Sequence, residues 1–216
     1  MSIDKLEGIA EDIRKDFDAQ TEVRDTALSN ARTLTRHCAH AIRAVHREEF
    51  DNADEELAAA GELAQALRGN LENFPGIYHA GYTQDALKEY AEAKVVYALI
   101  KNVDMPSHLD LKLEGSTYMK GLSEVVGELR RRILDLLRGG HSEEVERLLN
   151  AQDDIYDVLV TMDYSDAITY GLRRQTDVAR SIIERTRGDI TISYRQQRLE
   201  ETMREMEDRL NGGGEG

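Results

Sequence analysis

Proline, which ends or kinks a helix, occurs at only two of the 216 positions, Pro75 and Pro106. The rest of the chain is rich in alanine, glutamate, arginine and leucine, the residues that favour helices most. Hydrophobic residues make up 40% of the sequence, which is enough to build a core, and they recur mainly every three or four positions. The sequence therefore predicts an all-α protein.

Glycines, prolines and capping residues divide this sequence into seven helical segments. The first, from Ile3 to Arg47, is long, because it contains no proline and only one glycine, Gly8. The ITISY stretch after Gly188 predicts a kink, and the polar helix that follows it ends at Leu210. We expect one domain over residues 1–210 and a disordered, glycine-rich tail over 211–216. The five intervening helices are expected over residues 51–71, 83–104, 107–138, 142–161 and 165–187.

Membrane-spanning, secreted and disulfide-stabilised classes do not fit the sequence. No run of eighteen apolar residues occurs, and the N-terminal stretch is charged from its fourth residue, so we expect neither a membrane span nor a signal peptide. Cys38 is the single cysteine, which excludes an intrachain disulfide framework and a cysteine-based zinc cage. We expect Cys38 to pack in the core of a cytoplasmic protein.

The balance of charge argues at first against a nucleic-acid partner. The formal net charge is -14 at pH 7, and an acidic surface repels a phosphate backbone. However, 21 of the 28 basic residues are arginine, and four of these share one face of the first predicted helix. At about 100° and a rise of about 1.5 Å per residue, the four fall within about 60° and form a stripe about 22 Å long. This arginine stripe consists of Arg32, Arg36, Arg43 and Arg47.

The arginine stripe has two interpretations. Its length suits contact with several successive phosphates of a nucleic-acid strand. Alternatively, it is a solvated face whose arginines pair with Glu48, Glu49 and neighbouring helices. Three histidines, His37, His40 and His46, lie nearby in the sequence. We expect no carboxylate to be arranged as their partner, so we assign them no function.

Two glutamates in the segment LKEYAEAKVVYALIK occupy an unexpected position. Glu89 and Glu92 fall within about 60° of each other on a helix. They also fall in line with Val96, Leu99 and Val103, which should form a buried apolar stripe. Buried carboxylates are costly unless they are paired or bound to a metal. The pattern therefore predicts a compensating cation.

A second pair of carboxylates lies in the segment GLSEVVGELRRRILDLL. Glu124 and Glu128 are four residues apart, share one helix face and point away from the apolar stripe, as ordinary surface residues do. Because the linker around Pro106 is short, the helices that carry the two pairs can pack as an antiparallel hairpin. Four carboxylates that meet there would suit a hard divalent cation such as Mg²⁺ or Mn²⁺.

Several segments together resemble characteristic parts of the translin family, in the same order and at similar separations. They are RDTALSNARTLTRHCAHAIRAVHR, KEYAEAKVVYALIK and YMKGLSEVVGELRRRI, and the later LRRQTDVARSIIERTRGDI is similar to the family's last core helix. The likeness covers residues 24–190. It is closer to the TRAX branch (translin-associated factor X) than to translin itself, and the chain resembles an archaeal-type homologue of that branch. It implies a seven-helix, all-α bundle or superhelix with a long N-terminal helix, assembled into a homo-oligomeric, usually octameric shell.

The resemblance also implies a function and a set of site residues. Family members bind single-stranded RNA and DNA, and the TRAX branch cleaves RNA with Mg²⁺. The arginine stripe falls in the basic part of the family's first helix, where nucleic acid is contacted. The TRAX branch has aspartate where this chain has Glu124, and the extra methylene changes the reach of that carboxylate at a metal. The carboxylates that match the family's catalytic and metal-binding residues are Glu89, Glu92, Glu124 and Glu128.

These patterns lead to three hypotheses. The first is an endoribonuclease of the TRAX type, which binds single-stranded RNA or DNA and hydrolyses phosphodiester bonds with Mg²⁺ or Mn²⁺ inside an oligomeric shell. The second is a non-catalytic scaffold that binds RNA or DNA, like translin itself. The third is a ferritin-type bundle with two bridged metals, which requires a Glu-x-x-His repeat on two helices that neither carboxylate pair has.

Overall fold

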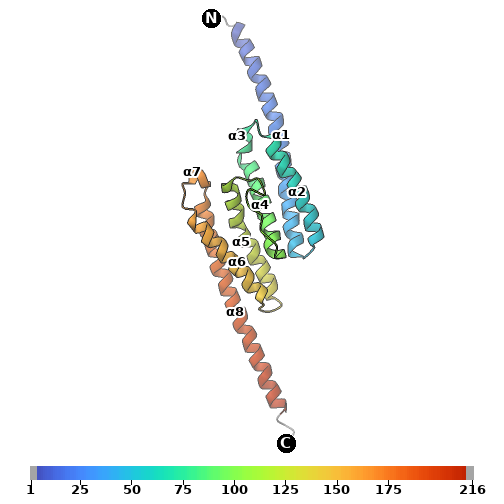
Figure 1. Cartoon of the computed structure of the whole chain (residues 1–216), viewed down its shortest axis with the longest axis vertical. Helices are drawn as coiled ribbons and strands as arrows, with labels where there is room; N and C mark the ends of the chain where they lie inside the picture. Colours follow the sequence, from blue (N-terminus) through green and yellow to red (C-terminus); the bar gives the residue numbers. More distant parts are fainter. Residues whose placement is uncertain (1–3, 213–216) are drawn as a thin grey trace. The chain divides into compact units, whose positions relative to one another are not determined.

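The computed structural model describes residues 4–212, and every regular element in this range is a helix (Figure 1). This confirms the predicted all-α fold with a long N-terminal helix. Residues 213–216 of the predicted tail lie outside the described range. No helix in that range is long and apolar enough to cross a lipid bilayer. The helices are α1 (Asp4–His46), α2 (Phe50–Asn70), α3 (Pro75–Tyr78), α4 (Gly81–Lys101), α5 (Gly115–Leu137), α6 (Glu143–Thr161), α7 (Asp166–Thr169) and α8 (Leu172–Gly212).

The chain forms two compact units. The first contains the residues up to 97 together with 106–121, and the second contains 98–105 together with the residues from 122 onward. Helices α4 and α5 are each continuous and contribute turns to both units. The expectation of a single domain over residues 1–210 stays a prediction.

In the first unit, α1 and α2 pack along each other as an antiparallel pair (Figure 1). The chain reverses between Arg47 and Glu49, where Glu48 adopts a left-handed backbone conformation with a φ of 61°. The buried side of α1 includes Cys38, as predicted, and the facing side of α2 is rich in alanine, which lets the two backbones approach closely. The buried residues are Leu34, Cys38, Ile42 and Val45 on α1 and Ala53, Leu57, Ala60, Ala64 and Leu67 on α2.

Helix α5 begins later than its capping residues predict. Ser107 and Asp110 do bond as in a capping box: the Ser107 amide donates to the Asp110 carboxylate at 2.8 Å, and the Asp110 amide donates to the Ser107 hydroxyl at 3.2 Å. These bonds close a turn that does not continue as a helix. Lys112 then takes a left-handed conformation with a φ of 53°, so the regular helix starts only at Gly115.

The last helix, α8, is continuous where the sequence predicts a kink. It runs unbroken from Leu172 to Gly212, through Gly188 and the ITISY stretch. A single glycine costs a helix about 1 kcal/mol relative to alanine, and packing in the second unit offsets this cost. Ile183 and Ile190 are buried on either side of the glycine, and Asp189 forms a 2.7 Å ion pair with Arg130 of α5.

Candidate metal centre and nucleic-acid surface

Helix α4 carries the first carboxylate pair and is buried over most of its circumference. Val96 is fully buried, but Leu99 is only half-buried, and Val103 lies beyond the end of the helix with 49% of its surface exposed. The prediction of a single buried apolar stripe through Leu99 and Val103 is therefore wrong. The buried apolar residues of α4 are instead distributed around most of the helix. Glu92 is 7% exposed, as the sequence indicates, whereas Glu89 is half-buried and keeps partial access to water.

Gly121 allows α5 to approach α4 closely. A Cβ at this position would lie 2.8 Å from the Lys88 carbonyl oxygen and 2.9 Å from the Ala91 Cβ, which is closer than real side chains come. The glycine therefore lets the backbone of α5 lie against the turn of α4 that carries Glu89. Glu124 follows Gly121 by about one helical turn.

Three of the four predicted carboxylates come together. The carboxylate oxygens that Glu89, Glu92 and Glu124 offer all lie within 4.8 Å of one another, and we call this group the acidic triad. Like charges at such a separation repel strongly, so compensating cations or protons stabilise the arrangement. Lys88 supplies part of this compensation, since its Nζ lies 3.0 Å from the Glu89 carboxylate. The acidic triad could hold a metal ion.

The thiol of Cys38 on α1 lies close enough to Glu89 and Glu92 for their charges to affect its pKa. Burial raises the pKa of its thiol, and the negative charges of Glu89 and Glu92 raise this pKa further. A thiol that stays protonated is neither a reactive nucleophile nor a metal ligand. Cys38 is therefore a residue of the core, as predicted.

Glu128, the fourth predicted carboxylate, is not a member of the acidic triad. It lies one turn beyond Glu124 on α5, and its carboxylate is 3.6 Å from Nη1 of Arg131. Arg131 therefore competes with any other cation for the carboxylate oxygens of Glu128. A role for Glu128 at a metal stays a prediction.

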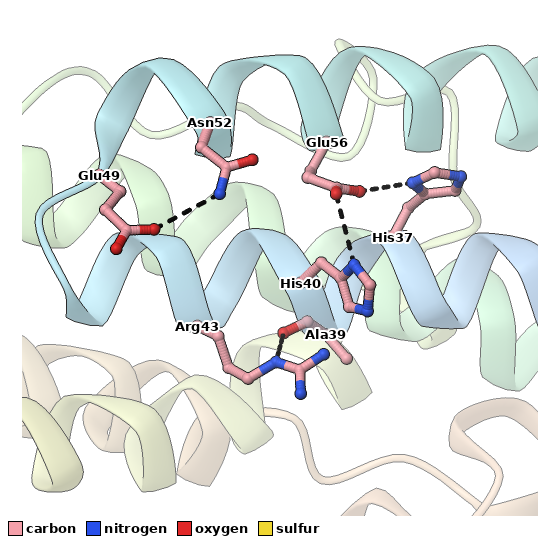
Figure 2. Close-up of polar contacts among 7 residues, drawn as sticks. All are labelled: His37, Ala39, His40, Arg43, Glu49, Asn52 and Glu56. Atoms are coloured by element: carbon pink, nitrogen blue, oxygen red, sulfur yellow. Dashed lines mark hydrogen bonds and ion pairs between the residues drawn. The ribbon is translucent and has the colours of Figure 1, made fainter.

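The four arginines of the arginine stripe are all exposed. Arg32, Arg36 and Arg43 lie on α1, whereas Arg47 directly follows its last residue. Arg43 Nε donates to the Ala39 carbonyl at 3.2 Å, which folds this side chain back along the helix (Figure 2). The arginine stripe is thus an accessible cationic surface, and its role in binding phosphates stays a prediction.

Known proteins are similar to this chain in both sequence and fold. No family model matches it. An uncharacterized protein of Methanocaldococcus jannaschii is 31% identical over 188 residues, which is 86% of this chain and 82% of that protein. The structure of Archaeoglobus AfC3PO in complex with duplex RNA has a TM-score of 0.81 and 30% identity, and the match covers 88% of this chain and 98% of AfC3PO. The chain belongs to the translin family.

Two further structures share the fold of this chain. A crystal structure of AfC3PO gives a TM-score of 0.80 at 29% identity, with the same coverage of both chains. Apo-NeC3PO, from Nematostella, gives a TM-score of 0.78 at 21% identity over 85% of this chain and 96% of its own, and shows the fold alone. The translin-family fold therefore extends over most of the chain.

The donor set of the acidic triad in this translin-family chain fits a hard cation. Carboxylate oxygens are the ligands that Mg²⁺, Ca²⁺ and Mn²⁺ prefer, whereas zinc and copper sites use imidazole or thiolate. No histidine belongs to the triad, and the thiol of Cys38 is protonated. The chemistry of these residues thus fits a divalent cation bound through oxygen.

Two histidines of α1 share a carboxylate partner that we did not predict. His37 Nδ1 lies 2.5 Å from one oxygen of Glu56 on α2, and His40 Nδ1 lies 3.3 Å from the other oxygen (Figure 2). The expectation that these histidines have no carboxylate partner was therefore wrong. Hydrogen bonds from His37 first, and then from His40, lower the pKa of the Glu56 carboxyl.

The sequence did contain a signal for this pairing. His40 and Glu56 each lie eight residues from Glu48, in the middle of the reversal between α1 and α2. Residues at equal distances from the turn of an antiparallel helix pair lie at the same height, and His37 is one turn away from His40 on the same side.

Proposed function

We propose that this chain is a TRAX-type member of the translin family, which binds single-stranded RNA or DNA and hydrolyses RNA with Mg²⁺ or Mn²⁺ in a homo-oligomeric, octameric shell. The observation that carries the proposal is the meeting of Glu89, Glu92 and Glu124 within 4.8 Å. The RNA complex of AfC3PO, at 30% identity, supports RNA as the ligand.

The residues of the chain have distinct roles in this reaction. Glu89, Glu92 and Glu124 would hold the divalent cation, and one of them accepts the proton that the attacking water loses. When bound, such a cation supplies a nucleophilic water and stabilises the charge that develops on the phosphate. The arginine stripe holds phosphates of the strand by charge-assisted hydrogen bonds. Glu128, one turn beyond Glu124 on α5, would be a further ligand of this cation.

The form of the nucleic acid is part of the test. AfC3PO is in complex with duplex RNA, whereas the family resemblance implies single strands. Labelled single-stranded RNA, duplex RNA and single-stranded DNA of one sequence, offered separately, will show which form the chain binds and which it cleaves. Binding should weaken as salt rises, because bound phosphates release counter-ions.

Replacement of Glu89 or Glu92 by glutamine tests the enzymatic role. Each change keeps the side-chain volume but removes a charge that holds the cation, so cleavage of labelled RNA in Mg²⁺ or Mn²⁺ should be lost while binding remains. Fragments are measured on denaturing gels and binding by fluorescence anisotropy. Asp85→Asn, at an exposed position of α4, is the matched control and should cleave like the wild type. Unchanged cleavage by Glu89→Gln and Glu92→Gln ends the enzymatic proposal.

A non-catalytic scaffold is the second candidate, and Glu124 favours it. The resembling TRAX branch has aspartate at this position, and the longer glutamate moves the carboxylate by about one bond length, which can weaken coordination. Glu124→Asp should therefore raise the rate of RNA cleavage, measured over a titration of Mg²⁺ and of Mn²⁺. If neither the wild type nor Glu124→Asp yields fragments at any metal concentration while both bind RNA, the scaffold is the correct function.

A further inference from the structure

The cluster formed by His37, His40 and Glu56 borders the arginine stripe. At about 100° per residue, His40 lies about 40° from Arg36 and about 60° from Arg43 around α1. The side chains of His40, His37 and Glu56 are 44%, 27% and 21% exposed, so the cluster is accessible from solvent. It therefore lies at the edge of the surface that we propose to bind phosphates, and the inference below rests on that proposed function.

The carboxylate selects one tautomer of both neutral rings. Hydrogen bonds from His37 and His40 lower the pKa of the Glu56 carboxyl, so Glu56 is ionised and its oxygens only accept. Each Nδ1 must then donate the proton. In a neutral ring of this tautomer Nε2 presents a lone pair, which repels a phosphate oxygen.

Protonation reverses the character of Nε2. The imidazolium ring carries an N–H at both nitrogens, and the second one lies on the side of the ring away from Glu56 (Figure 2). Histidine is the side chain whose ordinary charge change falls between about pH 5 and pH 8. When both rings are protonated, the charge of the cluster changes from about -1 to about +1.

The charged groups around the cluster favour an anion on α1. One turn before and one turn after His40 lie Arg36 and Arg43, both exposed. The carboxylates of α4 act on Cys38, which lies on the buried side of α1. On α2, the residues one turn from Glu56 carry no charge: Asn52, Ala53, Ala59 and Ala60. The exposed acidic residues Asp54 and Glu55 directly precede Glu56 in the chain. Protonated rings would therefore extend the positive surface of the two arginines.

We propose that His37 and His40 are phosphate contacts that become active on protonation, with Glu56 as the positioning residue that holds both rings. RNA then binds this surface more tightly in mildly acidic solution. For a single strand, log K falls with log salt by about 0.7 for each phosphate neutralised, so each new contact is worth about fivefold in affinity at about 0.1 M salt.

The test is a salt titration of binding at about pH 5.5 and about pH 8, on either side of the ordinary histidine range. The probe is an oligouridylate, whose bases do not titrate in this interval, labelled with a dye whose charge and emission are also independent of pH there. Divalent cations are left out so that no cleavage occurs. For the wild type we expect a slope steeper by about 1.4 at the lower pH, which is about 0.7 for each histidine. Equal affinities and equal slopes at both pH values overturn the proposal.

Glutamine variants assign the effect to the two rings. His40→Gln should remove about half of the change in slope, and the double variant with His37→Gln should remove all of it. His108→Gln, at an exposed position between α4 and α5, is the control and should behave like the wild type. A double variant that keeps the full pH response overturns the proposal, and the half-exposed His40→Gln variant provides the same test if the double variant does not fold.

Glu56→Gln separates positioning from simple charge. If Glu56 only repelled phosphates, its loss would raise affinity equally at both pH values. If it positions the rings, affinity rises at about pH 8 but the gain on acidification shrinks, because the protonated rings have lost the carboxylate that stabilises them. An undiminished pH response in Glu56→Gln overturns the positioning role.

Nitrogen-15 NMR of the rings tests the same arrangement without RNA. At about pH 8 both rings should show a protonated Nδ1 and an unprotonated Nε2, and the opposite tautomer overturns the inference. The two proposals fail in different ways. If no nucleic acid binds at either pH, the proposed function fails and this contact fails with it. Tight binding with the same affinity at both pH values overturns only the proposed histidine contact.

Discussion

Gly121 is the residue whose replacement should damage the acidic triad most without removing a carboxylate. In Gly121→Ala the added Cβ would lie 2.8 Å from the Lys88 carbonyl oxygen and 2.9 Å from the Ala91 Cβ, so α5 must shift. Overpacking of this kind costs about 1–3 kcal/mol of unfolding free energy, which urea unfolding would measure. A misplacement of about 1 Å at the reacting groups can cost about a hundredfold in rate, so cleavage should fall as well.

Gly127→Ala is the matched control for this prediction. Gly127 lies on the same helix, and an added Cβ there would meet nothing within 4 Å. Because alanine favours a helix over glycine by about 1 kcal/mol, Gly127→Ala should be as stable as the wild type or more stable, and fully active. If the two variants unfold at the same urea concentration and cleave RNA at the same rate, the close approach at Gly121 does not matter.

At the scale of single residues, the sequence predicts all three members of the acidic triad but does not distinguish Glu128 from them. Glu89 and Glu92 stand out because they interrupt an apolar helix, and Glu92 is indeed buried. Glu124 and Glu128 look alike in the sequence, since both lie off the apolar stripe of their helix. Only packing separates them, because Gly121 brings the turn before Glu124 against α4, whereas Glu128 lies beside Arg131.

At the scale of helices, buried stripes are predicted better than helix ends. The core side of α1 follows directly from the period of its apolar residues, because each of them must face α2 or the interior. The start of α5 does not, since the bonds of Ser107 and Asp110 suit an isolated turn as well as a helix. Local hydrogen bonds are the same in both cases, and the next residues decide which one forms.

Helix α8 shows the opposite error, because the sequence predicts a kink where the helix is continuous. Gly188 and the β-branched residues after it have weak helix propensity, and the sequence therefore predicts a kink. The penalty is about 1 kcal/mol for the glycine, whereas a buried isoleucine contributes about 1.5–3 kcal/mol. Ile183 and Ile190 are both buried, so tertiary packing keeps the helix continuous through this stretch.

At the scale of the whole molecule, the acidic triad should link stability to divalent cations. The chain already carries a formal charge of -14, and three carboxylates within 4.8 Å add repulsion that a bound cation removes. A ligand at about one hundred times its Kd stabilises a protein by about 2.7 kcal/mol. For a chain of this size, this corresponds to an increase in Tm of about 5–10 °C, which circular dichroism would follow in Mg²⁺ or Mn²⁺ at constant ionic strength.

The variant Glu92→Gln tests whether the stabilisation comes from a cation bound at the acidic triad. Without divalent cations the variant should be more stable than the wild type, because one of the three repelling charges is gone while the side-chain volume is kept. With divalent cations the order should reverse, since the wild type gains the binding free energy and the variant does not. A general effect of salt on an acidic protein would instead raise the Tm of both proteins alike. Equal increases in Tm for the wild type and Glu92→Gln would therefore assign the stabilisation to surface screening and remove the triad as a metal site.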